Sequence, residues 1–114
     1  MEINTFQITS VRTMPTIQDG RYSALDKSNY AMGLAGESGE LVDLMKKEIH
    51  HGHAPDVESI KKECGDVFHY LAGIATMYGL TLEEIALANV DKLQRRYPTG
   101  FSTKDSLKRV DVHG

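Results

Sequence analysis

The sequence lacks the features that would assign it to a specialised class of protein. Its 114 residues include one cysteine and no tryptophan, so an internal disulfide and a cysteine-rich metal site are excluded. No apolar run approaches the roughly 20 residues that a membrane span needs. The first residues also lack the basic and apolar segments of a signal peptide. We therefore expect a cytoplasmic protein that has no membrane partner.

An excess of positive charge is also absent. The formal net charge of -3 at pH 7 gives no electrostatic reason to expect nucleic-acid binding. Hydrophobic residues make up 40% of the chain and charged residues 25%, which is typical of a globular protein. This length predicts a single domain over residues 1–114 with a modest hydrophobic core.

Alternating strand patterns are missing as well, and apolar residues recur with the period of a helix. Gly52, Pro55 and Gly79 are typical of positions where helices end. The pattern predicts helices over about residues 3–12, 23–50, 57–78 and 81–97, followed by a polar C-terminal tail from about residue 98 to 114. The predicted fold class is therefore all-α, an antiparallel bundle of about four helices.

Two pairs of carboxylates lie beside the apolar stripes of the second and third predicted helices. Glu37 lies within its stripe and Glu40 at its edge, and Glu63 and Asp66 repeat this arrangement on the next helix. Four neighbouring carboxylates cannot all stay ionised without a cation, and oxygen ligands favour Mg²⁺ or Mn²⁺. The pattern predicts a site for one metal ion or two. The alternative interpretation is that each pair belongs to a solvated helix face.

Three further segments carry a family resemblance: GLAGESGELVDLMKK, ECGD and NVDKLQRRYPTGF. Together they resemble the MazG-like nucleoside triphosphate pyrophosphohydrolases of the all-α NTP pyrophosphatase superfamily. Their Glu-x-x-Glu and Glu-x-x-Asp motifs fall on the same four carboxylates, and the resemblance covers nearly the whole chain. Many members carry a further glutamate where this chain has Gly36. Because that position lies away from the face of Glu37, we expect its loss to matter less.

The resemblance implies Mg²⁺-dependent hydrolysis of a nucleoside triphosphate between the α and β phosphates, which releases a nucleoside monophosphate and pyrophosphate. Either Glu37 or Glu40 would act as the general base. The residues expected to bind substrate are Asn89, Lys92 and Arg96 on the fourth helix, with Lys47 and Tyr70; Gln7 and Asn29 are weaker candidates for recognising the base. Basic residues in a last helical turn also complement the helix dipole, and an ordinary core tyrosine explains Tyr70 equally well. The preferred base and sugar stay open.

Other conspicuous residues have simpler interpretations. His50, His51 and His53 follow a helix end, where histidines cap carbonyls or face solvent. Cys64 is expected to be a buried thiol. A di-iron bundle would use Glu-x-x-His pairs, which Asp66 to His69 echoes, but His69 lies about 120° from Glu63 on the helix. That angle argues against a di-iron centre.

A non-catalytic helical module that binds nucleotides or a partner protein is the main alternative to an enzyme. An interaction module whose acidic residues form a solvated surface has no reason to melt at a higher temperature in Mg²⁺, whereas a protein with a metal site does. The apolar faces, which include Leu71, Ile74 and Tyr78, are broader than a short bundle can bury. We therefore expect a homodimer or a homotetramer.

Overall fold

The computed structural model describes residues 1–14 and 22–109, and in these ranges the chain is all-α without a β-strand. The elements are α1 (Ile3–Ser10), the short 3₁₀ helix η1 (Val11–Thr13), α2 (Ala24–His51), α3 (Val57–Met77), α4 (Leu82–Arg96) and α5 (Thr103–Lys108). The predicted fold class is confirmed. The chain divides into two compact units, Met1–Thr81 and Leu82–Gly114.

Helix α2 has the start and stop signals that its sequence predicts. The Ser23 side chain accepts a hydrogen bond from the backbone N–H of Asp26, and the Asp26 carboxylate accepts one from the N–H of Ser23. This capping box satisfies donors that a helix leaves unpaired at its start. At the other end Gly52 has φ of 74°, a left-handed conformation that glycine adopts without a steric cost.

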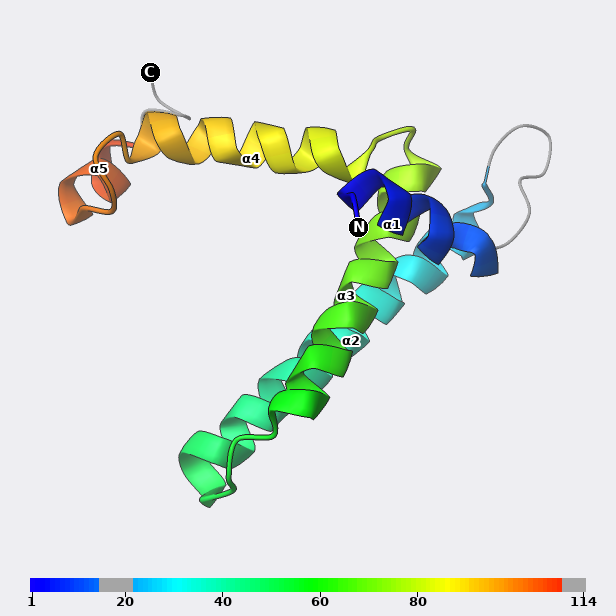
Figure 1. The fold of residues 1–114 in the computed structure, drawn as a ribbon, viewed down its shortest axis with the longest axis horizontal. Helices are drawn as coiled ribbons and strands as arrows, with labels where there is room; N and C mark the ends of the chain where they lie inside the picture. The colour runs from blue at the N-terminus through cyan, green and yellow to red at the C-terminus, as the bar shows by residue number, and fades with distance from the viewer. Residues whose placement is uncertain (15–21, 110–114) are drawn as a thin grey trace. The chain divides into compact units, whose positions relative to one another are not determined.

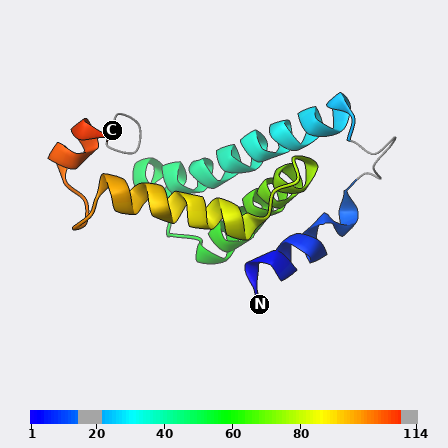
Figure 2. The ribbon, with the colours of Figure 1, turned by 90° about the horizontal axis from the view of Figure 1, so that it is seen from above.

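A short connection turns the chain back, so α2 and α3 form an antiparallel hairpin in which they lie side by side (Figures 1 and 2). Asp56 begins α3 by accepting hydrogen bonds from the backbone N–H and the hydroxyl of Ser59. Helix α1 packs against α3 in the same unit. Both predicted carboxylate pairs lie on this hairpin, one pair on α2 and the other on α3.

The buried part of this unit is small and lies between the helices. Tyr30 is 4% exposed, and Ala72 and Ala75 are fully covered. Many large apolar side chains stay exposed on or directly after the two long helices: Leu25, Met32, Val42 and Ile49 on α2, Val57, Phe68 and Leu71 on α3, and Tyr78 just after α3.

The second unit contains α4 and α5. Helix α4 begins at Leu82, directly after Thr81, as the sequence predicts. Helix α5 lies in the predicted polar tail, where Ser102 accepts a hydrogen bond from the N–H of Asp105. This helix was not predicted from the sequence, because six residues are too few to show an apolar period.

Among the described residues, no single helix is both long and apolar enough to cross a membrane. Helices α3 and α4 reach that length and composition only when they are counted together.

Candidate metal centre

The hairpin brings the predicted carboxylates together from two helices. Glu37 on α2, and Glu63 and Asp66 on α3, each offer one oxygen atom, and these atoms lie within 4.8 Å of one another. Glu40 lies one turn after Glu37 on α2, is exposed and is outside this group of three. The four residues are called the carboxylate cluster below. Because α2 and α3 are antiparallel, the two i, i+3 pairs face each other across the hairpin.

Two oxygen atoms of the cluster are buried without a donor. Glu37 Oε2 and Glu63 Oε2 are shielded from solvent, and neither has a hydrogen-bond partner among the described residues. An ionised carboxylate can only accept hydrogen bonds, and leaving such a group buried and unpaired is unfavourable. A divalent cation at this position would satisfy both atoms, so the residues fit a metal ion.

The electrostatics of the cluster agree with this interpretation. The pKa of Glu63 is raised, first because its carboxyl group shares a hydrogen bond with that of Glu37, and then because it loses solvent. The negative charges of Glu37 and Asp66 raise it further, while the hydrogen bond with Glu40 acts in the opposite direction. Like charges this close favour proton uptake in the absence of a cation. Carboxylates of this kind are suited to Mg²⁺ or Mn²⁺.

The predicted phosphate ligands occupy both units. Lys47 is on α2, and its Nζ atom lies 3.0 Å from a carboxylate oxygen of Asp43. Asn89, Lys92 and Arg96 are on α4, in the second unit. Their spacing of three and four residues places them on one face of that helix. Arg96 lies over the ring of Tyr97, with 5.9 Å between its guanidinium carbon and the ring centroid.

Tyr70 belongs to a group of three rings beside the cluster. Its ring centroid lies 5.2 Å from that of Tyr30 and 5.1 Å from that of His69. His69 Nδ1 is 2.7 Å from Ser10 Oγ, and its Nε2 is 3.4 Å from the hydroxyl of Tyr30. His69 thus connects α1, α2 and α3 and is not one of the residues that share the candidate metal position.

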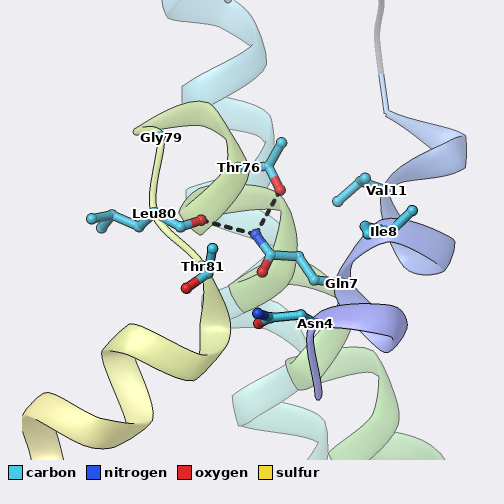
Figure 3. A pocket seen from close by; sticks show the side chains of 8 residues that line it. All are labelled: Asn4, Gln7, Ile8, Val11, Thr76, Gly79, Leu80 and Thr81. Atoms are coloured by element: carbon cyan, nitrogen blue, oxygen red, sulfur yellow. Dashed lines mark hydrogen bonds between the residues drawn. The ribbon is translucent and has the colours of Figure 1, made fainter. Parts of the chain in front are cut away.

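Gln7 lies at a cavity of about 420 Å³ beside the end of α3 (Figure 3). Its amide nitrogen donates hydrogen bonds to Thr76 Oγ1 at 3.0 Å and to the Leu80 carbonyl at 2.9 Å. Gln7 is 7% exposed, so this amide fixes α1 to α3. The other weaker candidate, Asn29, lies exposed on α2.

One expectation about α3 is wrong. Cys64 is exposed, although the helical wheel suggested a buried thiol. The helical wheel places Cys64 on the apolar side of α3. The residues of α3 that contact α2 form a stripe narrower than this apolar side, and the stripe runs through Glu63 and Tyr70 and leaves Cys64 outside. His50, His51 and His53 are exposed at the end of α2, as expected.

A repeated Tyr-x-x-Gly pattern, which was not predicted to matter, brings α2 and α3 into close contact. The segment YAMG on α2 ends in Gly33, and YLAG on α3 ends in Gly73. A Cβ atom added at Gly33 would meet the ring of Tyr70, and one added at Gly73 would meet the ring of Tyr30. The recurrence of Tyr-x-x-Gly on both long helices is the signal that could have revealed these contacts.

Comparison with known proteins gives a consistent result. Residues 26–101 match the MazG nucleotide pyrophosphohydrolase domain, and this range includes the whole carboxylate cluster. The chain is also similar to the gene 37 protein of Mycobacterium phage L5, with 28% identity over 105 residues, 88% of this chain and 92% of that protein. No solved structure matches the chain significantly.

Proposed function

This chain belongs to the MazG nucleotide pyrophosphohydrolase domain family, and we propose that it is a Mg²⁺-dependent nucleoside triphosphate pyrophosphohydrolase. It cleaves its substrate between the α and β phosphates and releases a nucleoside monophosphate and pyrophosphate. Residues 1–114 act as a single MazG-like domain in this proposal.

The observation that carries the proposal is the pair of buried, unpaired oxygen atoms inside the carboxylate cluster. Glu37 Oε2 and Glu63 Oε2 lack donors in the described structure, and one oxygen of Asp66 lies within 4.8 Å of an oxygen from each. A solvated acidic surface would expose these atoms to water. The arrangement instead supports a position for a divalent cation.

The four carboxylates take different roles in the proposed reaction. Glu37, Glu63 and Asp66 hold the metal position with Glu40 beside them, and a bound Mg²⁺ would neutralise phosphate charge and lower the pKa of a coordinated water. Glu40 is exposed and lies outside the three-oxygen group. It is therefore the better placed of the two glutamates to accept a proton from the attacking water. Glu37 remains the alternative base.

Cationic and amide side chains are the proposed substrate ligands besides the carboxylate cluster. Lys92 and Arg96 on α4, with Lys47 on α2, supply charge for the phosphate oxygens, and Asn89 supplies an amide donor. Lys47 already pairs with Asp43, so binding a phosphate would exchange one anion for another. Tyr70 is proposed to contact the substrate or a ligating carboxylate.

The proposed enzyme is a homodimer or a homotetramer. The exposed apolar side chains along α2 and α3, among them Val42, Ile49 and Tyr78, support association between copies of the chain. Small-angle scattering of the purified protein measures its mass, and a monomeric mass would contradict this part of the proposal.

The test is turnover of a panel of ribo- and deoxyribonucleoside triphosphates with Mg²⁺ or Mn²⁺, with the products separated by ion-exchange chromatography. We expect a nucleoside monophosphate and pyrophosphate from at least one substrate, and the panel also reveals the preferred base. Glu37→Gln and Asp66→Asn should abolish turnover because each removes a charged ligand. Glu58→Gln, an exposed position on the same helix as Asp66, is the matched control and should retain it.

Other products would contradict the proposal in recognisable ways. Release of a nucleoside diphosphate and inorganic phosphate would place cleavage at the wrong bond. Mg²⁺-dependent stabilisation without turnover of any triphosphate would favour a non-catalytic module that binds nucleotides.

A further inference from the structure

The contact between α2 and α3 depends on two reciprocal pairs of residues. The ring of Tyr70 covers Gly33, and the ring of Tyr30 covers Gly73; these four residues are called the Tyr–Gly seam. A Cβ atom added at either glycine would lie closer than 3.0 Å to atoms of the opposing ring. The absence of a side chain at Gly33 and Gly73 therefore sets how closely the helices approach.

Both rings pack against other rings, with Tyr30 buried and Tyr70 half-buried. Tyr30 is 4% exposed, and its ring centroid lies 5.2 Å from that of Tyr70 and 5.6 Å from that of His69. Met14 would also meet a Cβ atom added at Gly73, at 3.4 Å from its sulfur. Because packed interiors transmit strain, a methyl group at either glycine would move the helices as well as the rings.

The seam and the carboxylate cluster share one register. On α2 the order is Tyr30, Gly33, Glu37 and Glu40, at intervals of three, four and three residues. On α3 the order is Glu63, Asp66, Tyr70 and Gly73, at the same intervals. Because the helices are antiparallel, each member of the seam faces its partner, and each carboxylate pair then faces the other. Only about one helical turn, some 6 Å, separates Gly33 from Glu37 and Asp66 from Tyr70.

We propose that the Tyr–Gly seam positions the carboxylate cluster, by fixing the separation and the register of α2 and α3 one turn away from it. The residues of the seam are positioning residues, since they hold the helices that carry the ligands and are not themselves ligands. The inference rests on the proposed function, in which the cluster binds Mg²⁺ or Mn²⁺. Mg²⁺ requires nearly ideal ligand geometry, so a small displacement of one helix should weaken its binding.

The test is Mn²⁺ binding to the purified protein, followed by the loss of the free Mn²⁺ signal in electron paramagnetic resonance. Gly33→Ala should weaken Mn²⁺ binding by about 10-fold or more, the range for residues that support ligands. Gly39→Ala and Gly65→Ala are matched controls on α2 and α3, because a Cβ atom at either position meets nothing within 4 Å. Both controls should bind Mn²⁺ within about twofold of the parent, an effect below the range for supporting residues.

A compensating variant separates positioning from loss of folding. Tyr70→Ala removes the ring atoms that a Cβ atom at position 33 would meet. Adding Gly33→Ala to Tyr70→Ala should therefore weaken Mn²⁺ binding by less than adding Gly33→Ala to the parent. Circular dichroism identifies the temperature range in which every variant is folded, and binding is compared only there. General destabilisation lowers the melting temperature without changing the affinity of the folded protein.

Three outcomes would overturn the positioning role, and they differ in what they mean for the proposed metal site. Equal Mn²⁺ affinity in the parent and in folded Gly33→Ala would overturn the positioning role while leaving the proposed function intact. Affinity that falls in Gly33→Ala and in both glycine controls alike would also overturn it. Absence of Mn²⁺ binding in the parent protein would overturn the proposed metal site and, with it, this inference.

Discussion

At the scale of single residues, the cluster is a place where function and stability oppose each other. Glu37 and Glu63 each keep one oxygen atom buried without a donor, and the pKa of Glu63 is raised by its hydrogen bond with Glu37, by burial and by neighbouring charge. Residues selected for stability alone would not be arranged in this way. The free-energy cost of burying these carboxylate oxygens without a donor is explained if a divalent cation binds to them in the active protein.

This conflict predicts that Glu63→Gln stabilises the metal-free protein. The substitution removes one of several crowded negative charges, and the amide can donate a hydrogen bond to a neighbouring carboxylate. We expect the melting temperature in excess chelator to rise by a few degrees, measured by circular dichroism. The matched control is Glu58→Gln on the same helix, which is exposed and close to the helix N-terminus, so it should not raise the melting temperature. A drop in stability for Glu63→Gln would show that the ionised carboxylate is favourable without metal.

At the scale of elements, the caps of the two long helices were the most readily predicted features. Helix α2 begins after Ser23, a residue type favoured at N-caps, which forms a capping box with Asp26. The end of α2 at Gly52 and the start of α4 after Thr81 also follow from local sequence. Local chemistry decides such boundaries, because each unpaired backbone group at a helix end needs a nearby partner.

Removing a cap should weaken the hairpin by a predictable amount. Ser23→Ala eliminates the acceptor for the N–H of Asp26 and should lower the free energy of unfolding by about 1 kcal/mol. Urea titration followed by circular dichroism measures this loss. Ser28→Ala is the control, because Ser28 is exposed within the same helix and alanine is a good helix former. An equal loss in both variants would contradict the capping role.

The cap of α3 predicts a dependence of stability on pH. The pKa of Asp56 is lowered, first because its carboxylate accepts hydrogen bonds from the side chain and the backbone of Ser59. A lowered pKa contributes stability above the unfolded-state value of about 3.9, and that stability is lost as the pH falls through the folded-state value. Asn also caps helices but does not titrate. The melting temperature of the parent relative to Asp56→Asn should therefore decrease as the pH falls below about 4; a constant difference would contradict this.

Tertiary features were predicted less completely than local ones. The i, i+3 spacing predicted that carboxylates of the two helices would meet, and Glu37, Glu63 and Asp66 do lie together. Helical spacing could not give the distance between α2 and α3, which depends on Gly33 and Gly73 across the hairpin. It also misplaced Cys64, because the contact between two helices is narrower than the apolar stripe that predicts it.

At the scale of the whole molecule, the four carboxylates and the Tyr–Gly seam all lie in the first compact unit, Met1–Thr81. The proposed phosphate ligands Asn89, Lys92 and Arg96 lie in the second. The proposed metal site can therefore be tested without substrate, using the full chain. The exposed apolar residues of the hairpin offer a surface for a second copy of the chain, as the proposed homo-oligomer requires.

The most direct test of the central claim is the effect of saturating Mg²⁺ on the melting temperature. A cation that binds only the folded protein at 100 times its Kd contributes about 2.7 kcal/mol, so we predict a rise of several degrees or more for the parent and for Glu58→Gln. Glu37→Gln and Asp66→Asn should lose this rise, because each removes a ligand from the cluster. An equal rise in all four proteins, or none in the parent, would contradict the assignment of the carboxylate cluster as a metal site.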